Sequence, residues 1–554
     1  MNKTKLILLL LLCIATTYFV SSIFLLKDYG ITLDEPVNFG IGHKYLNYYQ
    51  TGHLDFQDNI PELNEHPKEY NAVAKKIPYM IFSLENILSA ISCKLFYEKL
   101  HILNPIDAHH IIILILLLIF IFIFFFFLQK YWGNFIALSS ILILLTIPRF
   151  FGHTFNNIKD IPEIIFFTIT IIYFVEFIIN EKAKFLYLSF IFFGFALATK
   201  MDALLIPIIL FLWQFKNIIT LIKNNSCIKI RTIINYFLGA LISFFIFISL
   251  FPPLQPWAYN NSRDFFDKAP IFFISLFRYC VGIGSDISLG WNLYSIKQIY
   301  YTTPILILVF FILGFIFILF NKHKYKFNLL LLIWVLFPVL RHCLPKVNHY
   351  DGLRHFLIFI VPFSIITAIG IKELANFINN KFKINKIFLS IFLFFIIFFT
   401  NIYNLIETHP YQTTFYNYFT GGLNGAQDKN IPFSCDYWLN SLRSGINWLN
   451  KNANLNANIT SPLLNYFDKD TFYFYDLRKD LKFIDFDKNN IPNNSYIINI
   501  PRRECRLDYE KFPTIQELIP LINNINFYDH VYSIERQNGK ILDIFYCKNK
   551  TPKL

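Results

Sequence analysis

Two adjacent carboxylates, Asp34 and Glu35, follow the first long apolar run of the chain. That run covers residues 6–26 and, at about 1.5 Å per residue of helix, can cross a hydrocarbon core about 30 Å thick. The two acids therefore lie just beyond a membrane wall. A carboxylate in a partly desolvated cleft, beside a second acid, has a raised pKa and is suited to be a general base.

A structural role for the acid pair is the alternative. An acid at a helix start stabilises the first free amide groups by about 1 kcal/mol. Behind the acids, Val37, Ile41, Tyr45 and Tyr48 recur at steps of four, four and three, which places them on one stripe of a helix. The pattern predicts a helix in the membrane interface, with Asp34 at its first turn.

Other polar residues that can bind anions or carry protons lie in the connections between apolar runs. Charged groups at the end of a membrane helix are costly and usually mark a site. The remaining candidates are His66, Arg149, His153, Lys159, Asp160, Glu163, Lys200, Asp202, Arg341, Arg354 and His355.

Several of these candidates also have a structural explanation. Arg149 and Lys159 can extend along the apolar surface to lipid headgroups. Lys200 and Asp202 can form an ion pair that serves only a tight turn. The histidines lack the HxxxH or HExxH spacing of a zinc helix, which favours hydrogen-bonding roles and predicts no metal site.

The composition is that of a membrane protein. Of 554 residues, 55% are hydrophobic and only 16% are charged, whereas a soluble domain has about 25% charged residues. The net charge of +13 then indicates contact with anionic lipid rather than with nucleic acid. Apolar, charge-poor windows recur at 6–26, 109–128, 134–148, 161–179, 185–199, 203–222, 232–251, 301–320, 327–340, 355–371 and 387–403.

Alternate connections between these windows are short and rich in lysine, for example at Lys182, Lys184, Lys322 and Lys324. The positive-inside rule places them and the N-terminus in the cytoplasm. Segment 77–97 carries Glu85 and is predicted to be interfacial or re-entrant instead of spanning.

The predicted fold is therefore mainly α. About 11 transmembrane helices form a domain over 1–403, with interfacial helices in a first outer loop at 27–108. Residues 404–554 are more polar and form a small α+β domain outside the membrane. Strands are expected at Phe472–Tyr475, Leu481–Ile484 and Tyr496–Ile500, and Asn538-Gly539 predicts a hairpin turn. A Cys505–Cys547 disulfide is left open.

Acids beside a cationic rim at headgroup depth suit one reaction class. A polyprenyl-phosphate sugar presents an anionic leaving group at that depth, where Lys and Arg can stabilise the departing phosphate. A carboxylate can deprotonate the incoming hydroxyl. The chain has no GxGxxG or Walker loop for a soluble nucleotide, which agrees with a lipid-linked donor.

At these residues the chain resembles the C-type membrane glycosyltransferases, in the branch of the protein O-mannosyltransferases and the lipid A aminoarabinose transferases. The resemblance covers about residues 6–403. It rests on Asp34-Glu35 after the first span, an incomplete His-Pro-Pro-x-x-Lys segment at His66, Lys200 at the end of a small-residue span, and Arg354 before a late span.

The resemblance implies an inverting sugar transfer from undecaprenyl phosphate to an acceptor outside the cytoplasm of a bacterium, at the inner membrane. It makes Asp34 the base or an acid that orients the acceptor, with Glu35 beside it, Asp160 and Glu163 second-site acids, and Lys200 and Arg354 phosphate ligands. We add Arg149 and Lys159 as phosphate ligands. The candidates for substrate contact are His66, His153, Asp202, Arg341 and His355.

Several points stay open at this stage. The acceptor is a protein hydroxyl or an envelope glycolipid, and the sugar is not specified. Acids near a phosphate could hold a divalent cation, but the nearby Lys and Arg could replace it. The alternative function is a transporter or flippase for a lipid-linked or anionic substrate, which would carry its charged residues at the bilayer midplane.

Overall fold

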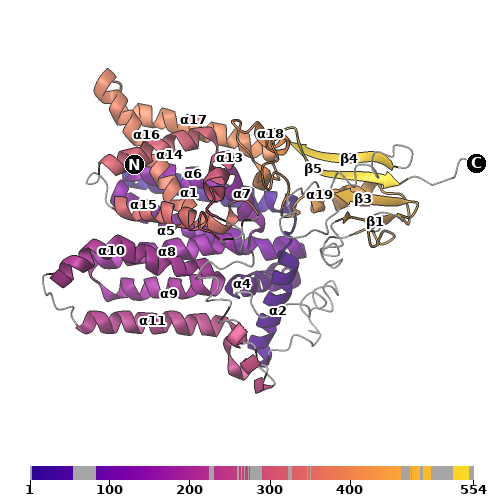
Figure 1. The fold of residues 1–554 in the computed structure, drawn as a ribbon, viewed down its shortest axis with the longest axis horizontal. Coiled ribbons are helices and arrows are strands. Elements are labelled where there is room, and N and C mark those ends of the chain that lie inside the picture. The colour runs from indigo at the N-terminus through magenta and orange to yellow at the C-terminus, as the bar shows by residue number, and fades with distance from the viewer. Residues whose placement is uncertain are drawn as a thin grey trace, which may run out of the picture.

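A helical body with a small β-sheet at one end makes up the computed structural model (Figure 1). The structure describes residues 3–53, 83–223, 230–258, 261–263, 265–267, 269–271, 274, 290–321, 327–345, 347, 349, 351–462, 475, 477–486, 491–500 and 528–547. His66 lies outside the described residues, as do Phe472–Phe474 of the first expected strand and Cys505 of the open disulfide.

Each of the eleven apolar windows contains a helix. Among the described residues, seven helices are long and apolar enough to cross a membrane, or eight if α6 and α7 (Pro148–Asn156), bent by 69°, form one broken span. The multi-pass fold is thus confirmed, whereas the number eleven stays a prediction. The helices are α1 Lys3–Leu25, α5 Pro105–Trp132, α6 Asn134–Thr146, α8 Asp160–Asn180, α9 Ala183–Thr199, α10 Leu205–Lys223, α11 Ile230–Leu250, α14 Ile305–Phe320, α15 Asn328–Arg341, α16 Ile360–Phe382 and α17 Lys386–Thr408.

Three of these helices, α9, α14 and α15, have only 17, 16 and 14 residues. Helix α14 packs closely on α16. A side chain on Gly314 of α14 would clash with the carbonyl oxygen of Ile366, and one on Gly370 of α16 with that of Phe310. The two backbones are therefore in direct contact, as small residues allow between membrane helices.

Two shorter helices connect α1 to α5 at the end of the bundle that faces the sheet (Figure 1). Helix α2 (Glu35–Thr51) begins directly after Asp34, which confirms the helix predicted there. Its stripe of Ile41, Tyr45 and Tyr48 packs on Ile87. Helix α4 (Leu84–Cys93) has 10 residues and continues into a π-helical turn, η3 (Lys94–Lys99). At about 1.5 Å per residue, α4 is too short to cross the bilayer, which agrees with an interfacial or re-entrant segment.

The tail contains helices α18 (Gly422–Asp428) and α19 (Leu442–Asn452) and a sheet of order β2-β1-β3-β5-β4. The strands are β1 Asn458–Thr460, β2 Lys482–Phe483, β3 Ser495–Asn499, β4 Tyr528–Arg536 and β5 Gly539–Cys547. β4 and β5 are antiparallel around Asn538, which confirms the hairpin. The parallel strand β1 was not predicted, because three residues are too few to show an alternating pattern.

The tail docks on the connection between α1 and α2. Arg443 of α19 forms an ion pair with Asp107 at 2.7 Å and donates to the Tyr29 carbonyl at 2.7 Å. The Gly30 amide donates to Asn440 Oδ1 at 2.5 Å, and the Leu33 amide donates to the Trp438 carbonyl at 3.2 Å. The segment that leads into Asp34 is therefore fixed by residues about 400 positions later.

Candidate active site

Asp34 occupies the cap position of α2, but its side chain makes no cap hydrogen bond. Instead, Oδ2 accepts from Arg354 Nη1 at 3.3 Å, across 320 residues of sequence. The side chain is 38% exposed. Helix capping therefore does not account for Asp34, and its carboxylate is open to a ligand.

Glu35 has a different environment. Its carboxylate is buried and accepts a hydrogen bond from the Thr32 amide at 2.5 Å. It also lies 2.9 Å from His110 Nε2 of α5. Burial raises the pKa of the Glu35 carboxyl above its ordinary value, while the contact with His110 acts in the opposite direction. Both oxygens are already occupied, so Glu35 anchors the start of α2 and Asp34 is the better candidate for proton transfer.

Arg354 is positioned by a tight turn. It opens the 3-10 helix η7 (Arg354–Phe359). Leu353 precedes it, after Asp351 and Gly352, which both have positive φ. Its Nη2 donates to Asp351 Oδ2 at 2.7 Å, and its guanidinium lies 4.6 Å from the ring centre of Trp438. With this second carboxylate and an aromatic face, Arg354 is held in place even when Asp34 is engaged elsewhere.

A second charged cluster surrounds Lys200, between α9 and α10. Its Nζ lies 3.0 Å from Asp160, 3.3 Å from Glu163 and 2.8 Å from Asp202. Arg341 of α15 reaches Asp202 at 3.5 Å. These charged residues, which are far apart in the sequence, therefore meet as predicted. Because three carboxylates already contact Lys200, it can serve the fold alone, and its role as a phosphate ligand stays a prediction.

Arg149 is fully buried, so the idea that it extends to lipid headgroups is wrong. Its guanidinium lies 4.9 Å from the ring centre of Tyr416 and 5.9 Å from that of Tyr437. Nε donates to the Phe415 carbonyl at 3.2 Å, but Nη1 and Nη2 make no hydrogen bond to the described residues. Two buried donors without partners are expected where an anion or a water binds.

The other candidates are spread around these groups. His153 is buried and pairs with Asn157 at 3.1 Å and with the Tyr437 hydroxyl at 3.4 Å, a hydrogen-bonding role. His355 is adjacent to Arg354 and lies within 6.5 Å of His342, ring centre to ring centre. Lys159 lines the cleft at Asp34.

That cleft is narrow. It is lined by Asp34, Asn156, Lys159, Arg354 and Trp438, among others, and encloses about 10 Å³, the space of one water. A sugar phosphate requires the surrounding side chains to move apart. Trp438 forms part of the wall although it lies in the tail, so the tail contributes to the site.

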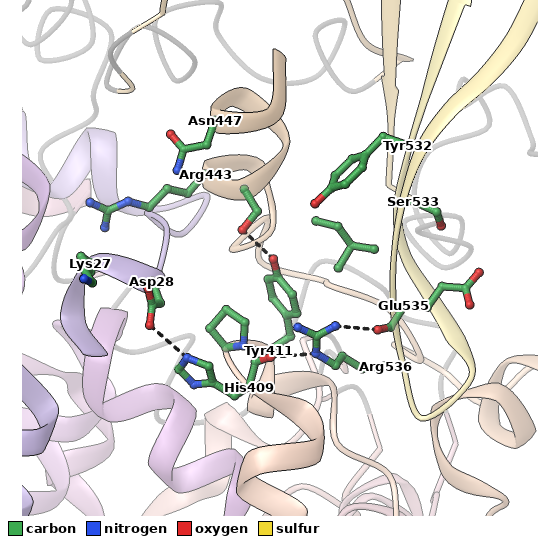
Figure 2. A pocket seen from close by; sticks show the side chains of 13 residues that line it. Lys27, Asp28, His409, Tyr411, Arg443, Asn447, Tyr532, Ser533, Glu535 and Arg536 are labelled. Carbon is green, nitrogen blue, oxygen red and sulfur yellow. Dashed lines mark hydrogen bonds and ion pairs between the residues drawn. The ribbon is translucent and has the colours of Figure 1, made fainter. Parts of the chain in front are cut away.

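A larger cavity of about 580 Å³ lies between the end of α1, the corner at His409 and the sheet (Figure 2). Asp28 pairs with His409 at 3.0 Å, Tyr411 donates to Ser444 at 2.7 Å, and Arg536 Nε donates to the His409 carbonyl at 2.7 Å. The wall is polar and aromatic, which suits a carbohydrate. This cavity could not be predicted from the sequence, because its lining residues come from four segments that are separated along the chain.

Comparisons with known proteins agree with this geometry. Residues 99–251 match the family described as dolichyl-phosphate-mannose-protein mannosyltransferase. The structure matches the crystal structure of ArnT from Cupriavidus metallidurans bound to undecaprenyl phosphate over 97% of both chains, with a TM-score of 0.51 and 11% sequence identity. The chain has the C-type glycosyltransferase fold. The predicted resemblance is confirmed at the level of the fold, whereas the roles of Asp34, Lys200 and Arg354 stay predictions.

Further comparisons add little to this assignment of the C-type fold. The oligosaccharyltransferase of Archaeoglobus fulgidus is similar over 88% of this chain and 69% of that chain, with 10% identity and a TM-score of 0.46. No curated protein matches by sequence. The family match spans α5 to α11 and includes Arg149, Asp160, Glu163 and Lys200, but not Asp34 or Arg354, which structure alone brings to the site.

Proposed function

We propose that this C-type protein transfers a sugar from a polyprenyl-phosphate donor to a hydroxyl of a protein or an envelope glycolipid, with inversion at the anomeric carbon. The ion pair between Asp34 and Arg354 carries this proposal. It joins a partly exposed acid at the start of α2 to a fixed cation at the start of η7, directly before α16, across 320 residues.

The two groups have complementary tasks in a single displacement. Asp34 takes the proton of the acceptor hydroxyl, whose oxygen attacks the anomeric carbon while the bond from that carbon to the phosphate oxygen breaks. Arg354 and Arg149 then neutralise the departing polyprenyl phosphate, with Lys159 at the edge of the cleft. The arginines are suited to this because a guanidinium binds two phosphate oxygens at once.

Arg149 gives the sharpest test of donor binding, because its Nη groups have no partner among the described residues. Arg149→Lys is expected to raise KM for the polyprenyl-phosphate sugar about tenfold, since one bidentate contact of about 1.4 kcal/mol is lost. The measurement is release of polyprenyl phosphate by the purified protein in lipid vesicles. Lys130→Gln is the control, because Lys130 pairs with Glu176 at the opposite end of α5 and should leave KM unchanged. An unchanged KM in Arg149→Lys would remove Arg149 from the donor site.

We propose that the reactive end faces the outside of the cytoplasmic membrane. Helix α8 starts at Asp160 in the Lys200 cluster and ends at Asn180, so the basic connection with Lys182 and Lys184 lies at the other end of the bundle. The positive-inside rule assigns that basic end to the cytoplasm. The acceptor then approaches from outside, and the polar cavity at His409 is the best place for it.

The orientation can be tested without touching the site. The full chain is fused at its C-terminus either to alkaline phosphatase, which is active only outside the cytoplasm, or to a fluorescent protein that matures only inside it. We expect an active phosphatase fusion and a dark fluorescent fusion, because the tail shares the reactive end. A bright fluorescent fusion would place the tail and Asp34 in the cytoplasm.

A further inference from the structure

Three side chains with metal-binding atoms meet where α2, α4 and α5 pack together. They are His43 of α2, Cys93 at the end of α4 and His109 near the start of α5, and all three are buried. One ligand atom from each lies within 4.8 Å of the other two. None of these three residues has a role in the sugar transfer proposed above.

The contacts of His109 fix how its ring is protonated. Nδ1 lies 2.7 Å from the Pro105 carbonyl oxygen, which can only accept, so Nδ1 carries the hydrogen. Nε2 then presents a lone pair to His43, whose Nε2 is 3.1 Å away. A histidine that binds a metal usually donates its other N–H to a carbonyl or carboxylate in this way.

The surroundings hold the ring of His109 in that orientation. The ring of Phe39 stacks on it, with 3.9 Å between the ring centres, and Ser89 donates to the His109 carbonyl at 3.0 Å. A ring that is fixed in this orientation favours a tightly held ion.

We propose that His43, Cys93 and His109 bind a Zn²⁺ ion. Two histidine nitrogens at about 2.0–2.1 Å from a tetrahedral zinc lie about 3.3 Å apart, and a thiolate sulfur at about 2.3 Å lies about 3.6 Å from each of them. The nitrogens in this structure are already 3.1 Å apart. Imidazole nitrogens and thiolate sulfurs are both ligands that zinc takes in proteins, and in sites with three protein ligands a water fills the fourth position.

The ion positions the reactive acid without touching the substrate. It ties α2, α4 and α5 together, and the next residue along α5, His110, binds Glu35 at 2.9 Å. His43 lies eight residues after Glu35 on α2, about two helical turns. Zinc would therefore fix the angle of α2 and hold Asp34 toward Arg354.

The test is the metal content of the full chain, purified in detergent, incubated with Zn²⁺ and desalted. We expect about one zinc per wild-type chain and a loss of at least about tenfold in Cys93→Ser and in His109→Gln. Cys547→Ser is the matched control, because Cys547 is also buried but lies in the sheet, and it should retain the zinc. Wild-type protein without zinc, or equal loss in the control, would overturn the proposal and leave a simple His–His hydrogen bond.

Cobalt distinguishes the thiolate from the imidazoles even if a variant is unstable. Co²⁺ added to wild-type protein should produce a thiolate-to-metal charge-transfer band, and this band should be missing in Cys93→Ser. A Co²⁺ spectrum without that band in wild type would exclude Cys93 as a ligand. The readouts need no sugar transfer, so they fail or succeed independently of the proposed function.

Discussion

Asp34→Asn is expected to slow sugar transfer by about 10²–10⁴-fold, the usual contribution of a general base. Asparagine keeps the shape of the side chain but cannot take the proton of the acceptor. Arg354 retains its contact with Asp351 at 2.7 Å, so the fold should survive. Since the Asp34 side chain is 38% exposed, the loss of the ion pair should cost at most about 1 kcal/mol of folding free energy.

The measurement is kcat for release of polyprenyl phosphate, together with the midpoint of thermal unfolding. Asp480→Asn removes a comparable acid–arginine pair, 2.7 Å to Arg478, from the tail and should leave kcat unchanged. Glu35→Gln offers a second comparison, because it should lower the unfolding midpoint through the lost contact with His110. Full turnover in a folded Asp34→Asn protein would assign the base to another residue.

The transmembrane plan was readable from the sequence because lipid imposes one rule on every span. In a bilayer, the backbone N–H and C=O groups of an apolar run must form hydrogen bonds within the run, and each window is therefore a helix. Position along the chain was enough to place Asp34 and Arg354 at the ends of spans. The sequence assigns both to the same end, but it does not select Arg354 as the partner of Asp34, because Lys159, Lys200 and Arg341 are assigned to that end as well.

What the sequence could not show depends on distant packing. Nothing around Trp438 indicates that it stacks under Arg354, because the two residues meet only when the tail docks on the body. From the sequence, Arg149 could contact lipid headgroups or be buried against aromatic rings. Only the folded position of Tyr416 shows that it is buried. His43, Cys93 and His109 follow no metal motif, since they come from three different helices.

Lys200→Gln is expected to destabilise the protein by about 3–5 kcal/mol, the cost of leaving buried charges without their partner. Asp160, Glu163 and Asp202 all contact Lys200 and are themselves almost fully buried. Arg341, 3.5 Å from Asp202, can compensate only one of them. The change should appear as a lower unfolding midpoint and a lower yield of membrane-inserted protein.

A second substitution separates the structural role of Lys200 from a role at the donor phosphate. Asp160 also binds Asn157, and Asp202 also binds Arg341, whereas Glu163 Oε1 makes no hydrogen bond to the described residues. Removing the charge of Glu163 should therefore best relieve the repulsion among the three carboxylates that Lys200→Gln leaves without a cation. The double variant Lys200→Gln with Glu163→Gln is expected to recover at least half of the stability that Lys200→Gln loses. We expect the double variant to have a KM for the donor close to the wild-type value, because the positive charge of Lys200 balances buried carboxylates and does not bind the donor. A folded double variant whose donor KM stays about tenfold higher would instead place Lys200 on the phosphate, beside Arg354.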